Sequence, residues 1–202
     1  MAKKHVDYYV SLNSPWTYLG SARFDAMCAK HGADVAIYPV SFGDVFAVSG
    51  GLPLPKRAPQ RQAYRMMELK RWRDHLGIPI QLEPKFFPSN EVPAAHAVIA
   101  VRESMGHAPA IKLAHAVLKA LWEEEKNPGD AATLDAIIAS VGLDAAKVTA
   151  MAADPKIAAR READTKMAIE RGVFGAPSYV IDGEIFWGQD RVDFVERKLA
   201  RG

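Results

Sequence analysis

The sequence has almost no cysteine, and this is its most informative absence. One Cys in 202 residues excludes an internal disulfide framework and agrees with a reducing compartment, so we expect a cytoplasmic protein. Cys28 lies on the apolar stripe of a predicted helix, and we interpret it as a packed core thiol. The 26 basic and 24 acidic residues form no basic stripe, which argues against a nucleic-acid partner.

Other signatures are also missing. The apolar runs are interrupted well before membrane-spanning length, and the first residues lack a signal-peptide core, so no membrane partner is expected. Phosphate-binding glycine loops, a nucleophile elbow and a His-Glu-x-x-His pattern are absent. The six His residues lack the spacing of metal-ligand pairs, so no metal site is predicted.

The chain begins with a pattern typical of a strand, a helix and a second strand. The β-rich run Val6–Val10 is followed by Ser14, a candidate N-cap, and Pro15, which is favourable at a first helical position. Gly32 follows the apolar stripe as a stop signal, and residues 33–40 alternate as a strand does. We therefore expect a right-handed βαβ unit with two parallel strands.

The middle of the chain is predicted to be helical. A Gly- and Pro-rich loop at 49–55 precedes a helix over 59–76, and the prolines of 78–90 predict an irregular segment. Further helices are expected over 92–105, 108–125, 130–141, 144–153 and 154–171.

The end of the chain predicts a β-hairpin and a last helix. Residues 175–181 and 184–188 flank Asp182-Gly183, a hairpin turn signal, and a helix is expected over about 190–199. Two strands alone are rarely stable, so the strands at both chain ends should form one sheet. The fold class is then α/β, with the helices as an insertion.

The turn Ser14-Pro15-Trp16-Thr17 has no sulfur, although thioredoxin-like proteins keep Cys-x-x-Cys in such a turn. A helix N-terminus stabilises an anion and lowers the pKa of a thiolate, so a reactive thiolate here would come from a ligand. Ser14 could donate a hydrogen bond to it, and Ala176, before Pro177, could pair with a peptide-like thiol. Glutathione has this chemistry. The alternative is that Ser14 and Asp190 are only helix caps.

Taken together, four stretches resemble the 2-hydroxychromene-2-carboxylate isomerase family, close to the kappa-class glutathione transferases in the DsbA-like thioredoxin superfamily. They are Ser14–Gly20, Tyr64–Pro79, Val173–Pro177 and Trp187–Arg191. The resemblance implies a thioredoxin-like fold with a large all-helical insertion. Residues 1–45 and 170–202 would form the thioredoxin-like domain, and 46–169 the inserted helical domain.

The resemblance also implies roles for single residues. Ser14 would be the catalytic residue that bonds the glutathione sulfur, Ala176 the residue that pairs with the cysteinyl unit, and Pro177 a cis-proline. Arg61 would meet the glycyl carboxylate, and Gln189 and Asp190 the γ-glutamyl end. The predicted glutathione-binding residues are Ser14, Arg61, Ala176, Pro177, Gln189, Asp190 and Arg191, and the predicted substrate-pocket residues are Trp16, Phe87, Asn90 and Trp187.

The leading hypothesis is a glutathione-dependent isomerase. It would interconvert 2-hydroxychromene-2-carboxylate, or a close analogue from aromatic degradation, with trans-o-hydroxybenzylidenepyruvate. Its partners would be glutathione and a small aromatic substrate, with a homodimer left open. The alternatives are a kappa-like glutathione transferase acting on electrophiles, a disulfide oxidoreductase, against which the missing sulfurs argue, and a binding module without chemistry.

Overall fold

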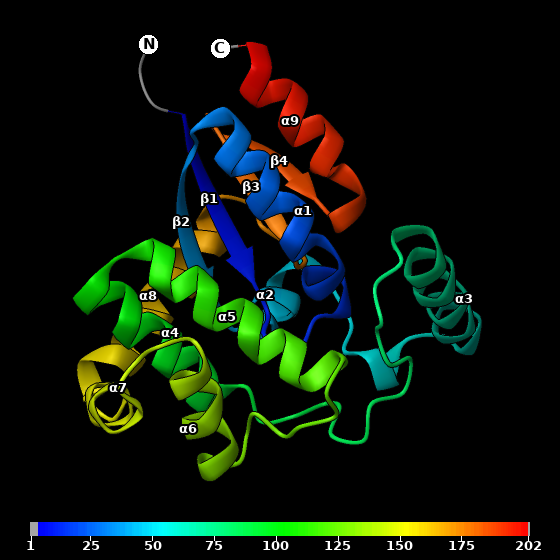
Figure 1. Ribbon diagram of the computed structural model, residues 1–202. Helices are drawn as coiled ribbons and strands as arrows, with labels where there is room; N and C mark the ends of the chain where they lie inside the picture. Colours follow the sequence, from blue (N-terminus) through cyan, green and yellow to red (C-terminus); the bar gives the residue numbers. More distant parts are fainter. Residues whose placement is uncertain (1–3, 202) are drawn as a thin grey trace.

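Both ends of the chain contribute to one four-stranded sheet. The computed structural model describes residues 4–201, and its strands lie in the order β2-β1-β3-β4 (Figure 1). Strand β1 is parallel to β2 and antiparallel to β3, and β3 and β4 form an antiparallel hairpin. The strands are β1 (His5–Val10), β2 (Asp34–Pro39), β3 (Ser178–Ile181) and β4 (Glu184–Trp187). The prediction that strands from both ends share one sheet is confirmed.

Helix α1 (Pro15–His31) connects β1 to β2 and begins and ends as its sequence predicts. Ser14 caps it, because the Ser14 hydroxyl oxygen accepts a hydrogen bond from the Thr17 amide at 3.1 Å. Gly32 ends it at φ +60°, a conformation that suits glycine. Cap chemistry within a few residues therefore sets both limits of this helix.

Seven helices lie between β2 and β3 in chain order (Figure 1). They are α2 (Phe42–Ser49), α3 (Pro59–Leu76), α4 (Val92–Met105), α5 (His107–Trp122), α6 (Ala131–Ser140), α7 (Ala145–Ala152) and α8 (Pro155–Glu170), with a 3₁₀ turn, η1 (Leu54–Lys56), before α3. The sequence did not predict α2. Helix α5 ends earlier than predicted, because Glu125 adopts φ +51° and the Lys126 amide closes on the Ala120 carbonyl at 2.8 Å.

The last helix also begins later than the sequence predicted. Gly188, at φ +107°, turns the chain out of β4, and a 3₁₀ turn, η2 (Gln189–Arg191), precedes α9 (Val192–Arg201). Asp190 lies inside that turn, so it does not occupy the position of a cap. The hairpin turn itself is as predicted, with Asp182 at φ +51° and Gly183 at φ +80°, the conformation of a type I′ turn.

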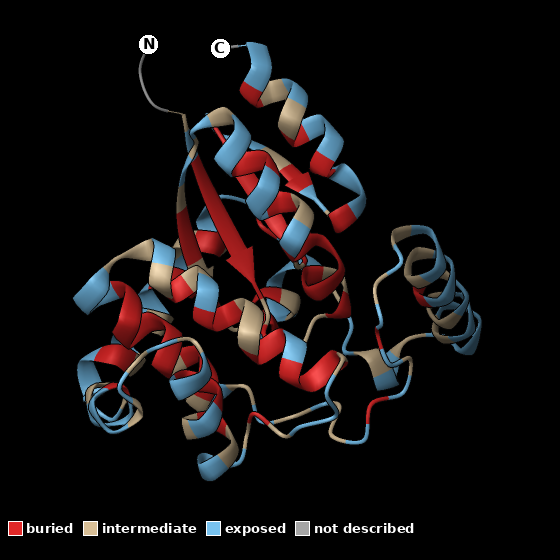
Figure 2. Cartoon of the chain, viewed as in Figure 1, coloured by how far each residue is buried: buried red, intermediate tan, exposed pale blue. Residues whose placement is uncertain are grey.

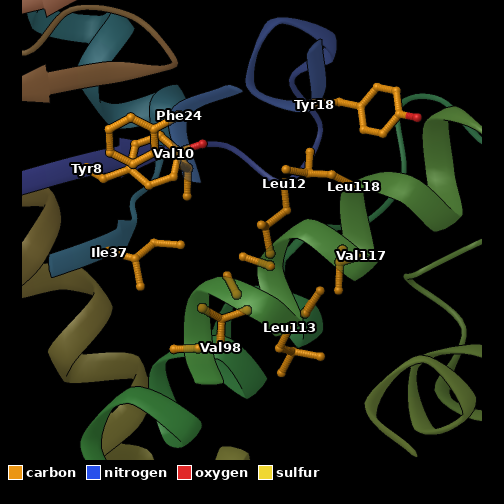
Figure 3. Close-up of a cluster of buried hydrophobic side chains, with 14 of the residues drawn as sticks. Tyr8, Val10, Leu12, Tyr18, Phe24, Ile37, Val98, Leu113, Val117 and Leu118 are labelled. Carbon is orange, nitrogen blue, oxygen red and sulfur yellow. The ribbon is translucent and has the colours of Figure 1, made fainter. Parts of the chain in front are cut away.

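Each face of the sheet has its own apolar core, because alternate residues of a strand point to opposite faces. Tyr8 packs with Phe24 and Tyr179 on the face covered by α1. Tyr9 points to the other face and packs with residues of α2 and α8. Figure 2 shows the buried residues along β1 and the inner helices, and Figure 3 shows the larger core continuing from Tyr8 to α4 and α5.

Side chains from the middle helices cap the open edge of β2. The Ile37 amide donates to Nδ1 of His107 at 3.1 Å, and the Ile37 carbonyl accepts from Nη1 of Arg102 at 3.1 Å. Arg102 also pairs with the buried Asp164 of α8, at 2.7 Å. An edge strand with unpaired backbone groups can pair with other chains, and here α4 and α5 satisfy those of Ile37. The division into a thioredoxin-like and an inserted domain stays a prediction.

Candidate active site

The first turn of α1 holds the predicted catalytic residue and a free backbone donor. Ser14 is half-buried, and its hydroxyl and carbonyl oxygens accept the amides of Thr17 and Tyr18 at 3.1 Å each. Pro15 has no N–H. Among the residues that the structure describes, the Trp16 amide is therefore the free donor of this turn. A free amide at a helix N-terminus, where the helix dipole is positive, is suited to an anion.

Ser14 faces the segment that precedes β3. Its hydroxyl points to the Ala176 carbonyl at the long distance of 3.5 Å, so this weak contact leaves the O–H able to donate to a better acceptor. The bond from Ala176 to Pro177 is cis, as the resemblance implies. Ala176 lies outside the paired residues of β3, and the Gly188 amide donates to the Pro177 carbonyl at 2.9 Å. The structure thus brings Ser14, Ala176, Pro177 and Gly188 together.

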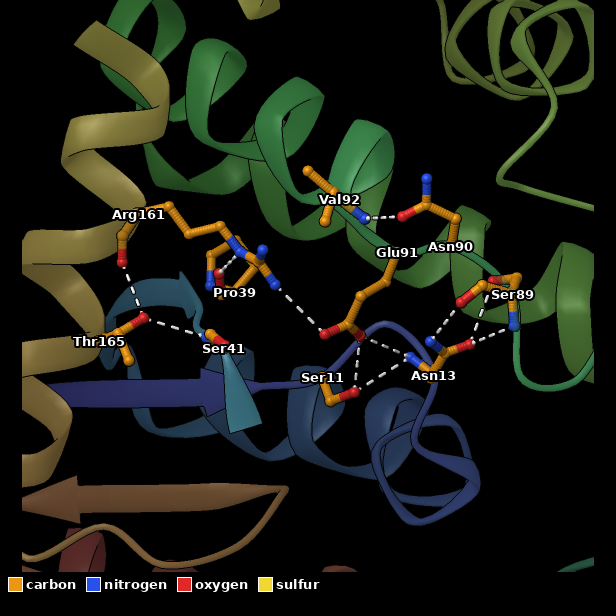
Figure 4. A network of polar contacts seen from close by, with 10 residues as sticks. All are labelled: Ser11, Asn13, Pro39, Ser41, Ser89, Asn90, Glu91, Val92, Arg161 and Thr165. Carbon is orange, nitrogen blue, oxygen red and sulfur yellow. Dashed lines mark hydrogen bonds and ion pairs between the residues drawn. The ribbon is translucent and has the colours of Figure 1, made fainter. Parts of the chain in front are cut away.

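The loop that leads into Ser14 is held by Asn13, a residue that the sequence analysis did not single out. Its side-chain Nδ2 donates to the Ser89 carbonyl at 2.8 Å, and its Oδ1 accepts from the Ser89 amide and hydroxyl at 3.1 Å each (Figure 4). These two residues are 76 positions apart in the chain. The contact sets where the segment 86–90 lies relative to Ser14.

Glu91 reinforces the same loop from the start of α4. Its Oε2 accepts from the Ser11 hydroxyl at 2.8 Å and from the Asn13 amide at 3.2 Å, while its Oε1 pairs with Arg161 of α8 at 3.2 Å (Figure 4). One carboxylate therefore joins the end of β1 to two helices. No local sequence signal marks Glu91, because all its partners are distant in the chain.

Gln189 is anchored to α1. Arg23 donates through Nη2 to the Gln189 main-chain carbonyl at 2.7 Å and to its side-chain oxygen at 2.5 Å. Gly20 allows this approach, because a Cβ there would lie 2.9 Å from the Gln189 Cβ. The Gln189 side-chain oxygen is thus already bonded within the protein, and Arg23 is a second positioning residue that sequence reasoning missed.

Asp190 and Arg191 project from the same turn. Both are exposed, and their side chains pair at 3.3 Å. The Asp190 carboxylate folds over Gly188, where a Cβ would come within 2.4 Å of it. A carboxylate with only an exposed partner remains available to an ammonium group of a ligand.

The four predicted pocket residues have different packing and hydrogen-bond partners. Trp187 is 51% exposed and packs against Phe174, with the rings tilted and their centroids 4.8 Å apart. Phe87 packs on Trp122 of α5, with centroids 4.8 Å apart, and Trp16 packs at the rim of the larger core. Asn90 is exposed, and its Oδ1 accepts the Val92 amide at 3.2 Å. Phe87 and Asn90 flank Ser89, and Trp187 lies in β4.

Arg61 lies on the first turn of α3 and is exposed. This helix stands at the edge of the molecule (Figure 1), and Leu69 is its one buried residue among those described. Arg61 therefore has room to reach a ligand, and within residues 4–201 no hydrogen bond joins it to Ser14.

Cys28 is not a chemical group of this site. It is buried, and burial raises the pKa of its thiol to about 12, which keeps it protonated and unreactive. Within residues 4–201 no cluster of three or more His, Cys, Asp or Glu side chains could hold a metal ion. None of the described helices is both long and apolar enough to cross a membrane.

Comparisons with known proteins indicate one family and one fold. The family described as the DSBA-like thioredoxin domain matches residues 5–200. A Sphingobium xenophagum protein named 2-hydroxychromene-2-carboxylate isomerase is 26% identical over 197 residues, which cover 97% of this chain and 98% of that protein.

Solved structures show the same arrangement. That of a 2-hydroxychromene-2-carboxylate isomerase aligns with a TM-score of 0.84 at 25% identity, over 98% of this chain and 95% of that one. The cytosolic disulfide reductase DsbM from Pseudomonas aeruginosa, solved with GSH, aligns with a TM-score of 0.68 at 17% identity, over 97% of this chain and 99% of that one. The predicted α/β thioredoxin-like fold of the DsbA type is confirmed.

Proposed function

Because the chain belongs to the DSBA-like thioredoxin domain family, and its relatives are named 2-hydroxychromene-2-carboxylate isomerase, we propose that it is a glutathione-dependent isomerase. It would interconvert 2-hydroxychromene-2-carboxylate, or a close aromatic analogue, with trans-o-hydroxybenzylidenepyruvate. The observation that carries the proposal is the position of Ser14. It caps the N-terminus of α1, the kind of turn in which thioredoxin-like proteins keep Cys-x-x-Cys, and faces the residue before Pro177.

The residues of this turn fit a bound thiolate. Within the described residues, the Ser14 O–H as a donor has only a 3.5 Å contact with the Ala176 carbonyl, so it can donate to a sulfur anion, and the Trp16 amide offers a second donor. Hydrogen bonds to a charged acceptor contribute about 1.5–3 kcal/mol each. When bound, glutathione would supply the thiolate that adds to the conjugated substrate, permits rotation about the former double bond and leaves again.

Other residues would hold the remainder of glutathione. The free backbone of Ala176 would pair with the cysteinyl unit, as an added strand does. The exposed Asp190 carboxylate would meet the ammonium group, and Arg61 the glycyl carboxylate. Gln189 would contribute through its backbone, because Arg23 already occupies its side-chain oxygen. Trp16 and Phe87 would provide aromatic surface for the substrate.

Turnover of 2-hydroxychromene-2-carboxylate with and without glutathione tests the proposal. We expect isomerisation that depends on glutathione and leaves its total concentration unchanged. Isomerisation without glutathione would refute a mechanism in which glutathione supplies the thiolate. Consumption of glutathione by a chromogenic electrophile, with no isomerisation, would favour the transferase alternative.

Binding of glutathione is tested separately by calorimetry on D190A. We expect this variant to bind glutathione more weakly by about 1–3 kcal/mol, because a charge-assisted hydrogen bond is lost. D193A is the matched control, since Asp193 is an exposed carboxylate three residues further along the chain. Equal affinities of the two variants would remove Asp190 from the glutathione site.

A further inference from the structure

Three arginines lie together where η1 leads into α3. Arg61 and Arg65 are one helical turn apart, so they share a face of α3, and Arg57 ends the preceding turn. Among residues 4–201 none of the three forms an ion pair with a carboxylate. The nearest acid in α3, Glu68, pairs with Arg71 instead. The positive charges of this group are therefore not compensated within the described chain.

Arg65 is the most constrained of the three. Its guanidinium lies over the Phe87 ring, 5.4 Å from the centroid. Among the described residues its buried Nη2 has no hydrogen-bond partner, and its Nη1 has only a 3.6 Å contact with the Met66 sulfur. Burial and the nearby Arg57 charge lower the pKa of Arg65 to about 10. A buried donor and an unpaired charge are both unfavourable unless a partner satisfies them.

The arginine group lies next to the Ser14 loop. Phe87, which Arg65 covers, is two residues before Ser89, so their Cα atoms are at most about 7.6 Å apart. Ser89 is in turn bonded to Asn13, the neighbour of Ser14. A ligand group held by Arg65 would therefore sit beside the aromatic ring on the segment that borders the Ser14 turn.

We propose that Arg65, assisted by Arg57, binds the carboxylate of the acceptor substrate, so that this chain selects conjugated aromatic acids over their neutral analogues. The unpaired Nη2 beside the Phe87 ring is the feature that carries this assignment, which rests on the proposed function. A guanidinium fork matches a carboxylate in two parallel hydrogen bonds, and the adjacent ring offers a surface to the conjugated body of the acid. Arg61, which is exposed, remains assigned to glutathione.

The test is calorimetric binding of two probes of the same shape, trans-cinnamate and the neutral cinnamamide, with and without glutathione. We expect the wild type to bind cinnamate roughly tenfold more tightly than cinnamamide, as for a charge-assisted hydrogen bond. R65M should lose this preference and keep its affinity for glutathione. K70M, which removes an exposed charge from the same helix, should behave as the wild type.

Two further measurements, on R65K and on the wild type with added salt, test the assignment if R65M does not fold. R65K retains the charge without the fork, so its preference for cinnamate should lie between those of wild type and R65M. Added salt should weaken binding of cinnamate and leave binding of cinnamamide unchanged in the wild type. A salt-independent preference would contradict the assignment.

Failure of the subsite and failure of the proposed function give different results. Any of three results would overturn the subsite. They are equal wild-type affinities for the two probes, equal losses of the cinnamate preference in R65M and K70M, and a loss of glutathione affinity in R65M. Glutathione-dependent isomerisation could persist in all three cases. If the wild type binds no glutathione, the proposed function fails, and the probe titrations without glutathione still decide the subsite.

Discussion

Replacing Asn13 with alanine should loosen the loop that carries Ser14. The Asn13 side chain makes three hydrogen bonds with Ser89, at 2.8, 3.1 and 3.1 Å. A net contribution of about 0.5–1.5 kcal/mol per bond, reduced because water can reach these half-buried groups, gives a loss of about 2–3 kcal/mol in the free energy of unfolding. Misplacement of Ser14 should also lower kcat/KM, by about tenfold.

The measurements are urea unfolding and kcat/KM for the chromene acid at saturating glutathione. N127A is the matched control, because Asn127 accepts one backbone bond, from the Gly129 amide at 3.1 Å, in the turn before α6. We expect it to lose about 1 kcal/mol and to keep wild-type activity. The reasoning is refuted if N13A loses no more stability than N127A, or if N13A retains wild-type kcat/KM despite its lower stability.

Three further predictions concern single side chains. S14A should lower turnover roughly tenfold to a hundredfold and leave a residual rate that rises with pH. If S14A has the pH–rate profile of the wild type, Ser14 is only a helix cap. R23M should release Gln189 and weaken glutathione binding several-fold by calorimetry, with partial rescue in R23K. Burial, and then Arg102, lower the pKa of His107, and its neutral ring accepts the Ile37 amide. The folded protein should therefore lose stability as the pH falls from about 6.5 through the lowered pKa. H107Q should flatten this loss in acid unfolding, and an unchanged slope would contradict the assignment.

The fold was predictable where its signals are local. Ser14 begins α1, Gly32 ends it, and Asp182-Gly183 turns the hairpin, because caps and turns depend on backbone groups within a few residues. Where the local signal was unusual, the prediction was wrong. Helix α5 ends at Trp122, before the predicted end, and Glu125 in the turn after it adopts φ +51°, a conformation typical of glycine.

The sequence by itself determined that a sulfur-free turn at a helix N-terminus would lie near a proline that opens a strand. Its resemblance to a known family also indicated Ser14, Ala176 and Pro177 as neighbours. Only the tertiary structure decided that Asn13 and Glu91 hold this turn, that Arg23 engages Gln189, and that Arg65 lies over Phe87 with no ion-pair partner among residues 4–201. Asn13 is 76 positions from Ser89, and Arg23 is 166 from Gln189. Hydrogen bonds between such distant residues follow from how helices pack on the sheet, so no local pattern of residues specifies them.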